Sequence, residues 1–348
     1  DAAIAALEGP TLFDERQEVP ELLGAVKRAV DHDGAPGRFL LTGSVRAELD
    51  VATWPGTGRI VPLTMHPLTQ REIVGTARTG LVDRLVAGET VDPPVDPPNL
   101  TDYVDMALRG GFPEAALGLT DSTRRRWLEG YVTQTVARDA PGIGRRDVEQ
   151  LRRYFSASAL HTAGVIEQTA IARDVAVDRK TGAGYDDLLH RLVLVDSPPP
   201  WTTNRLKRLI RNPKRFLVDA SLLVGLAGVD RSAILADGGL LGRMIETFVA
   251  SQLRVEQAVS SSRFRTYHLR QHDGRREVDF VVEFGAESII GIEVKSSSAP
   301  VERDARHLSW LRDSHPERFV SGLVLHTGPG VYELGDRITA APIACFWS

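Results

Sequence analysis

The sequence has a single cysteine, Cys345, among its 348 residues. One cysteine excludes an intrachain disulfide and any metal cluster built from several cysteines. The nine histidines are scattered, and none of them forms the HExxH pattern of zinc proteases. A chain without disulfides is typical of a reducing compartment, and we therefore expect a cytoplasmic protein.

Long hydrophobic runs are also absent from the sequence. The most apolar stretch, residues 216–229, is interrupted by Asp219 and Ser221, and it is shorter than the ~18 residues that a membrane-spanning helix needs. No membrane partner is expected. The first residues, 1–7, contain neither a basic leader nor an initiating methionine, so we expect no secretory signal and a chain that begins inside a longer protein.

The composition is that of a folded globular protein. Hydrophobic residues make up 42% and charged residues 25% of the chain, and these ordinary values exclude a disordered or fibrous class. A length of 348 residues favours two or three domains. The net charge of −4 is spread unevenly, with an acidic excess in residues 1–100 and a basic excess in residues 101–220. A nucleic-acid partner would therefore prefer the middle third.

A short apolar run, residues 11–13, ends in the acidic pair Asp14 and Glu15. Residues 19–30 then have helical hydrophobic spacing, and residues 38–44 have the pattern of a second short strand. Strands separated by a helix predict a parallel sheet in an α/β fold. In P-loop enzymes the first carboxylate after such a strand holds Mg²⁺ and the second activates the attacking water. The alternative interpretation is a solvated strand end.

Five short motifs follow one another along the first third of the chain. They are residues 11–23 (TLFDERQEVPELL), 39–44 (FLLTGS), 58–60 (GRI), 67–69 (PLT) and 109–114 (RGGFPE). In this order they resemble a large bacterial and archaeal family of predicted AAA-type ATPases. Proteins of that family have a Walker B strand and an Arg-Gly-Gly-Phe-Pro motif, followed by a carboxy-terminal domain of uncharacterised function.

The resemblance implies that the chain binds and hydrolyses ATP with Mg²⁺ and forms a homo-oligomer. It implies Asp14 at the metal, Glu15 at the attacking water, Ser44 near the terminal phosphate and Arg59 near the nucleotide of a neighbouring subunit. The phosphate-binding motif GxxxxGK(S/T) occurs nowhere in the sequence, and the family places it before the Asp-Glu strand. We therefore expect this chain to start after the Walker A region and to bind ATP poorly by itself, because that loop holds the β- and γ-phosphates.

The middle of the chain has helical periodicity over residues 103–194, after a Pro-rich stretch at residues 89–99. Residues 168–195 have the pattern helix, tight turn, helix, strand, which is typical of a winged helix. The second helix would begin with three polar residues placed to contact DNA, namely Arg179, Lys180 and Thr181. A packing module between two domains is the alternative.

A basic stripe follows at residues 205–215, with six basic residues and no acidic one. Such a stripe can contact the phosphates of a nucleic acid. A solvated loop explains the same composition.

The last third of the chain carries a second group of charged residues. Residues 277–283 and 288–295, joined by a turn at Gly285, predict a β-hairpin. Because side chains alternate along strands, Asp279, Glu293 and Lys295 converge on one face. The spacing resembles the PD-(D/E)xK nuclease fold, in which Glu246 matches a helix glutamate before the core. The resemblance implies Mg²⁺ at Glu246, Asp279 and Glu293, with Lys295 as the catalytic lysine. The alternative is a buried ion-pair network in a fold that no longer cuts.

The sequence thus predicts an α/β protein with four parts. They are a partial AAA-type P-loop NTPase parallel sheet (1–88), a Pro-rich linker and helical connector (89–115), a winged helix-turn-helix region (116–200) and a restriction-endonuclease-like α/β domain (201–348). The expected function is that of an ATP-binding and ATP-hydrolysing AAA-type protein with a DNA-associated role. One alternative is a magnesium-dependent nuclease-like or DNA-binding module without ATPase activity. Another is a non-catalytic interaction protein of a defence or toxin–antitoxin system.

Overall fold

The structure is a computed structural model, and it describes the chain except for a few short stretches. The residues outside the description are 1, 8, 17, 18, 20, 44–57, 139–144, 204–211 and 272–273. The chain divides into two units, which are described one at a time. One unit contains residues 1–65 with 187–193, and the other contains residues 66–186 with 194–348.

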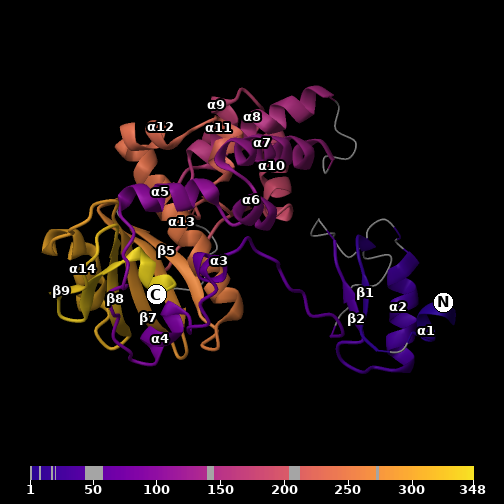
Figure 1. The fold of residues 1–348 in the computed structure, drawn as a ribbon, viewed down its shortest axis with the longest axis horizontal. Coiled ribbons are helices and arrows are strands. Elements are labelled where there is room, and N and C mark those ends of the chain that lie inside the picture. The colour runs from indigo at the N-terminus through magenta and orange to yellow at the C-terminus, as the bar shows by residue number, and fades with distance from the viewer. Residues whose placement is uncertain are drawn as a thin grey trace. The chain divides into compact units, whose positions relative to one another are not determined.

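The smaller unit contains the predicted strand, helix and strand at its amino-terminal end. Strand β1 (Thr11–Phe13) pairs in parallel with β2 (Phe39–Leu41), and the helix α2 (Glu21–His32) lies between them in sequence (Figure 1). The prediction of a parallel α/β arrangement is therefore confirmed for this segment. A four-residue helix, α1 (Ala2–Ala5), precedes it.

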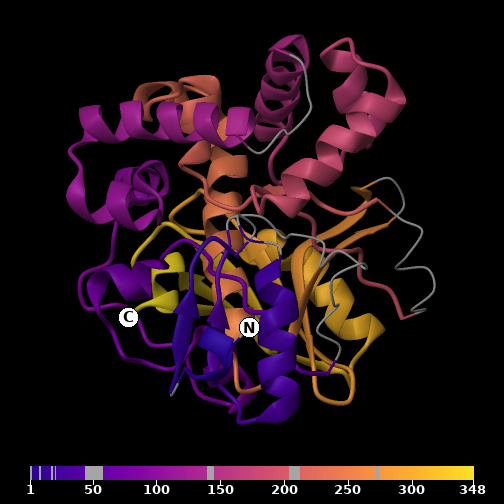
Figure 2. The same cartoon turned by 90° about the vertical axis from the view of Figure 1, so that its right-hand side faces the viewer.

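The larger unit has a helical layer next to a mixed sheet, and Figures 1 and 2 show the helices α7 to α11 above the sheet. The helices before the sheet are α3 (Gln70–Val74), α4 (Leu81–Val86), α5 (Leu100–Arg109), α6 (Pro113–Gly118), α7 (Asp121–Arg138), α8 (Arg145–Leu160), α9 (Gln168–Asp174), α10 (Arg179–Arg191), α11 (Leu222–Ala227), α12 (Arg231–Ala236) and α13 (Gly238–Val259). Helix α11 packs on α7 and α8. The close approach depends on Gly225, since a Cβ atom there would lie 2.7 Å from the carbonyl oxygen of Leu128.

The sheet of the larger unit has six strands in the order β5, β6, β7, β8, β10, β9. Their bounds are β5 (Arg265–Gln271), β6 (Arg276–Phe284), β7 (Ser288–Val294), β8 (Phe319–His326), β9 (Tyr332–Gly335) and β10 (Ile338–Pro342). Strands β5, β6 and β7 are antiparallel, whereas β7, β8 and β10 run parallel to one another. A separate pair, β3 (Val195–Asp196) and β4 (Phe216–Leu217), is antiparallel. The predicted hairpin is confirmed as β6 and β7, with Gly285 in the turn at φ 55°.

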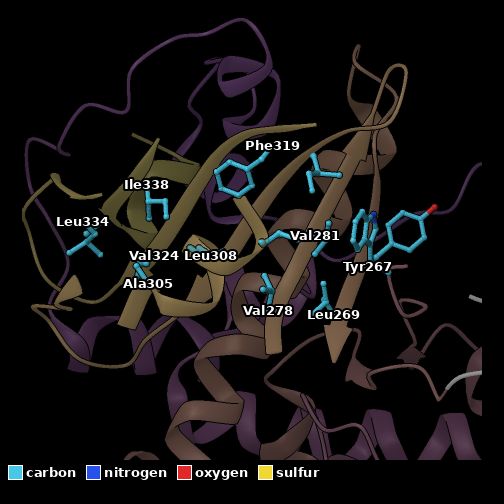
Figure 3. Close-up of a cluster of buried hydrophobic side chains, with 14 residues drawn as sticks. Tyr267, Leu269, Val278, Val281, Ala305, Leu308, Phe319, Val324, Leu334 and Ile338 are labelled. Carbon is cyan, nitrogen blue, oxygen red and sulfur yellow. The ribbon is translucent and has the colours of Figure 1, made fainter. Parts of the chain in front are cut away.

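The core of the sheet lies beneath α14 (Arg306–Ser314), which links β7 to β8. Leu308 of this helix packs among buried side chains of the strands, including Val281, Phe319 and Val324 (Figure 3). Gly291 lies under the helix, where a Cβ atom would be 2.7 Å from a methyl carbon of Leu308. The helix therefore lies so close to the sheet that a larger residue on β7 would have to displace it.

The RGGF motif forms the junction between α5 and α6. Gly111 donates its N–H to the carboxylate of Asp219 at 2.7 Å and accepts a hydrogen bond from the N–H of Leu68 at 2.7 Å. A Cβ atom on Gly111 would lie 2.0 Å from the carbonyl oxygen of Leu68, and one on Gly110 would overlap Asp219 and Ser221. Both glycines are therefore required because two other segments of the chain pass directly against this backbone.

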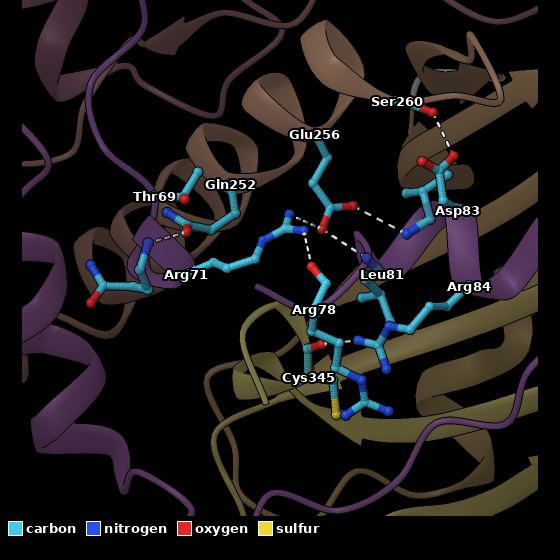
Figure 4. Close-up of polar contacts among 12 residues, drawn as sticks. Thr69, Arg71, Arg78, Leu81, Asp83, Arg84, Gln252, Glu256, Ser260 and Cys345 are labelled. Atoms are coloured by element: carbon cyan, nitrogen blue, oxygen red, sulfur yellow. Dashed lines mark hydrogen bonds and ion pairs between the residues drawn. The ribbon is translucent and has the colours of Figure 1, made fainter. Parts of the chain in front are cut away.

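Residues 66–88, which the sequence analysis groups with the AAA-type segment, pack within the larger unit. Thr69 begins α3 with a capping box, in which its side chain accepts a hydrogen bond from Glu72 N–H. The N–H of Gln70 donates to the side chain of Gln252 in α13 at 2.8 Å (Figure 4). In the described part of the chain, no helix is both long and apolar enough to span a bilayer.

Candidate functional sites

Asp14 lies at the carboxyl end of β1, beside the carboxyl end of β2. The hydroxyl of Thr42, the residue after β2, donates a hydrogen bond to Asp14 Oδ1. The strands continue far enough to hold this pair, because Thr42 N–H donates to the carbonyl oxygen of Phe13 at 3.0 Å. Two oxygen-bearing side chains therefore meet at one edge of the parallel pair, where ligand sites of α/β sheets are found.

Glu15 follows Asp14 in an uncommon backbone conformation. Its φ is 51°, which lies in the left-handed region that residues other than glycine seldom adopt. Its N–H donates to Asp14 Oδ1 at 3.1 Å, and this bond holds the turn. Such strained residues cluster at functional sites, so the conformation of Glu15 supports its assignment as a candidate.

The structure places Arg59 elsewhere on the smaller unit. Arg59 forms an ion pair with Asp31 in the last turn of α2, and Asp31 also pairs with Lys27 at 3.1 Å. Ser44, the expected residue near the terminal phosphate, lies outside the described residues. The amino-terminal candidates that the structure brings together are therefore Asp14 and Glu15, with Thr42 as a neighbour that the sequence analysis did not single out.

The second group of candidates converges in the larger unit. Asp279 on β6 and Glu293 on β7 lie opposite each other when the register Phe280↔Ile292 is continued by one pair. The N–H of Val294 donates to Asp279 Oδ2 at 2.9 Å. Lys295 follows β7, and its Nζ lies 3.5 Å from Glu293 Oε2.

Lys214 brings the remaining carboxylate, that of Glu246 on α13, into the same cluster. Its Nζ forms an ion pair with Glu246, lies 2.9 Å from Asp279 Oδ1 and lies 3.9 Å from Glu277 Oε1. Only 2% of Lys214 is exposed. An ammonium group thus sits among three carboxylates. We call Lys214, Glu246, Glu277, Asp279, Glu293 and Lys295 the carboxylate–lysine cluster.

Lys214 is a member of this cluster that the sequence analysis missed, because it was grouped with the basic stripe of residues 205–215. Lys214 is buried in the cluster, and Arg215 is 5% exposed with both guanidinium arms on Asp186. Neither can contact a nucleic-acid phosphate from these positions. Residues 205–211 lie outside the described residues. The apolar run that starts at Phe216 was the one signal that the end of the stripe enters the core.

Burial and mutual repulsion change the acidity of the cluster. They raise the pKa of Glu246 to about 8, with Asp279 as the repelling charge and Lys214 opposing the rise. The same two causes raise the pKa of Glu293 well above its usual value. Burial also acts on Asp279, but the ammonium of Lys214 and the N–H of Val294 hold its pKa below the usual value. Asp279 is therefore the carboxyl group that ionises most readily of the three, whereas burial and repulsion favour the protonated forms of Glu246 and Glu293.

Two histidines border the cluster without entering it. His268 Nε2 lies 3.2 Å from the carbonyl oxygen of Asn212, and burial and the nearby Lys214 lower its pKa to about 4. His307 Nδ1 lies 2.6 Å from the carbonyl oxygen of Glu277 and 3.7 Å from Glu293 Oε1. Burial likewise lowers the pKa of His307. Both rings are therefore expected to be neutral at pH 7.

The cluster does not fit a divalent metal ion as it stands. The Nζ atom of Lys214 already occupies the space that Glu246 and Asp279 face. Across the described residues, no three His, Cys, Asp or Glu side chains are grouped so that they could hold a metal ion. The arrangement corresponds to the buried ion-pair network that the sequence left open as an alternative.

Helices α9 and α10 occupy the segment in which a winged helix was expected. Asp178 starts α10, accepting hydrogen bonds from the N–H groups of Lys180 and Thr181 and from the Thr181 hydroxyl at 2.6 Å. Gly182 lets the two helices touch, since a Cβ atom there would lie 2.7 Å from the Cβ of Ala172. Arg179 and Lys180 are exposed, so two of the three expected DNA-contacting residues face solvent.

Comparison with known proteins gives three family matches along the chain. Residues 3–74 match an AAA domain, residues 100–233 match a domain of unknown function (DUF8612), and residues 241–346 match another domain of unknown function (DUF4143). The AAA match contains Asp14, Glu15 and Thr42, and the DUF4143 match contains all but one member of the carboxylate–lysine cluster. Lys214 comes from the DUF8612 match.

Two curated relatives are similar to nearly the whole chain. They are the uncharacterized proteins Rv2008c of Mycobacterium tuberculosis and Mb2031c of Mycobacterium bovis. Each is 28% identical over 343 residues, which cover 98% of this chain and 70% of the relative. The AAA match supports the AAA-type assignment made from the motifs.

Proposed function

We propose that the protein is an ATP-hydrolysing machine of the AAA type, with its hydrolytic carboxylates at Asp14 and Glu15. One observation carries the proposal: Asp14 and Thr42 directly follow the parallel strands β1 and β2 and are hydrogen-bonded to each other, inside the segment that matches an AAA domain. Carboxylate and hydroxyl oxygens are ligands that Mg²⁺ prefers. The donor set at this sheet edge therefore suits the metal of an ATP complex.

Each residue at this edge has a distinct role in the proposed reaction. Bound Mg²⁺ neutralises charge on the phosphates of ATP. Asp14, oriented by the Thr42 hydroxyl, would hold that ion at the end of β1. Glu15, which follows Asp14 in a turn at φ 51°, would orient the attacking water and accept its proton.

The test is ATP hydrolysis by the complete product of the gene, with the wild-type protein compared with Glu15→Gln. Loss of the base should lower kcat by about 10²-fold or more, while ATP binding is retained because the amide has the same shape. The matched control is Glu21→Gln, in the first turn of α2, whose side chain is exposed. Hydrolysis by Glu15→Gln at the wild-type rate would remove the proposed role of Glu15.

The 348-residue chain alone should bind ATP weakly, because the sequence has no GxxxxGK(S/T) motif to hold the phosphates. Calorimetric titration of Mg²⁺ and ATP into this chain measures the affinity. A micromolar Kd would contradict the expectation and would require another phosphate-binding segment within these residues.

The carboxy-terminal domain supports a second candidate role, which is association with DNA. The convergence of Asp279, Glu293 and Lys295 favours the resemblance to PD-(D/E)xK nucleases. The position of Lys214 among the carboxylates favours a nuclease-like domain that does not cut. We expect no Mg²⁺-dependent nicking of supercoiled plasmid. Nicking that disappears in Asp279→Ala or Lys295→Ala would instead support the nuclease alternative, and an interaction protein would show neither hydrolysis nor nicking.

A further inference from the structure

The carboxylate–lysine cluster contains an unusual buried cation. Lys214 precedes β4, yet its side chain reaches Glu246 on α13 and Asp279 on β6. It is 2% exposed, so its charge is almost completely removed from water. An isolated ammonium ion would be very unfavourable in such a place, and its partners must therefore compensate it fully.

The partners match what an ammonium group requires. A lysine Nζ has three N–H donors and no acceptor. Carboxylate oxygens of Glu246, Asp279 and Glu277 surround this Nζ, the last at 3.9 Å. Carboxylate oxygens are also the ligands that a divalent metal ion such as Mg²⁺ takes. The two cations would therefore compete for one position.

The backbone on both sides of Lys214 is held in place. Its own N–H donates to the carbonyl oxygen of Pro198 at 3.3 Å, and the N–H of Arg215 donates to that of Gly164 at 2.9 Å. The Arg215 guanidinium is fixed on Asp186 by two hydrogen bonds. These contacts fix the backbone from which the side chain of Lys214 reaches into the cluster. A metal ion could enter only if that side chain rotated away from its carboxylate partners.

We propose that Lys214 is a built-in cation that takes the place of a divalent metal in the carboxylate–lysine cluster. The cluster then organises β6, β7 and α13 without an ion from solution, and Asp279 cannot act as a metal ligand while Lys214 is present. This inference concerns the carboxy-terminal domain and does not depend on ATP hydrolysis at Asp14 and Glu15.

The experiment is titration of the 348-residue chain with Mn²⁺, followed by electron paramagnetic resonance of the free ion. The wild-type protein and Asp279→Asn should give the same isotherm, because no Mn²⁺ binds at the cluster. Lys214→Met removes the charged amino group and keeps an unbranched side chain that is one atom shorter. It should therefore gain a Mn²⁺ site that the double variant Lys214→Met with Asp279→Asn lacks. The matched control is Lys180→Met, which removes an exposed lysine of α10 and should gain no site.

Each outcome decides the proposal. A Mn²⁺ site in the wild-type chain that disappears in Asp279→Asn would overturn it, and so would a folded Lys214→Met variant without a new site. If Lys214→Met does not fold, the comparison of wild type with Asp279→Asn still decides the question. In that case, addition of Mg²⁺ should change neither the Tm of the wild-type protein nor the Tm of Asp279→Asn. None of these results bears on the rate of ATP hydrolysis, so failure here is distinguishable from failure of the proposed function.

Discussion

The guanidinium of Arg71 forms an ion pair with the carboxylate of Glu256, at 2.9 Å and with 2% of the glutamate side chain exposed (Figure 4). The same carboxylate accepts hydrogen bonds from the N–H groups of Leu81 and Val82 at 2.8 and 3.1 Å. Arg71 belongs to the AAA match at residues 3–74, and Glu256 belongs to the DUF4143 match. One buried carboxylate therefore joins the end of one matched segment to the long helix of another.

Removing this carboxylate should weaken the larger unit strongly. Glu256→Ala leaves a part-buried arginine and two N–H groups without their acceptor, so we expect the free energy of unfolding to fall by about 3 kcal/mol or more. Urea denaturation followed by circular dichroism measures the change. The control is Glu149→Ala, which breaks the exposed Arg153–Glu149 pair and should change the free energy by no more than about 0.5 kcal/mol. Equal effects of the two variants would contradict the role of Glu256.

Gly111 should not tolerate a side chain. A Cβ atom there would lie 2.0 Å from the carbonyl oxygen of Leu68, so Gly111→Ala must displace the backbone and should cost about 3 kcal/mol or more of stability. Gly130→Ala in α7 is the matched control, since nothing lies within 4 Å of its Cβ position. This control should stabilise the helix by about 0.5–1 kcal/mol. Thermal unfolding should therefore move the two Tm values in opposite directions.

The free energy of unfolding should depend on pH through the ionisation of Asp83. Burial by itself would raise its pKa, but hydrogen bonds from Ser260, Ser261 and Ser262 lower the pKa from 3.8 to about 2. A folded-state pKa below the unfolded value stabilises the protein above pH 3.8, and this contribution disappears as the pH falls towards 2. Asp83→Asn should therefore be less stable than wild type at pH 7, with a difference that shrinks between pH 4 and pH 2. A constant difference in urea denaturation over this range would contradict the assignment.

Cys345 should be unreactive in the folded protein. It is buried, and burial raises the pKa of its thiol to about 11. Since the thiolate is the reactive form, a disulfide reagent at pH 8 should label the folded chain far more slowly than the chain in urea. The sequence has no other cysteine, so absorbance of the released thiol reports on this position alone. Rapid labelling without denaturant would show that the carboxy-terminal segment opens.

Local patterns of the sequence were sufficient to predict the strand, turn and helix around Asp14 and the β6–β7 hairpin. In both places the information lies within about 20 residues, because apolar alternation, helical spacing and turn residues act over short distances. The convergence of Asp279 with Glu293 followed from the same alternation. The Arg-Gly-Gly-Phe motif was also visible in the sequence, but the reason for its glycines was not. The atoms that exclude a side chain belong to Asp219 and Ser221 at Gly110 and to Leu68 at Gly111.

The position of Lys214 in the cluster could not be predicted from local sequence patterns. Its partner Asp279 is 65 positions away, and in the sequence Lys214 belongs to a run of basic residues that resembles a solvated stripe. The sequence by itself determined the segment from β1 to β2, the β6–β7 hairpin and the face that Asp279 and Glu293 share. Only the tertiary structure decided which cation those carboxylates meet. Burial removes water as a competing partner, so the charge of the cluster depends on a contact between residues that are distant in the sequence.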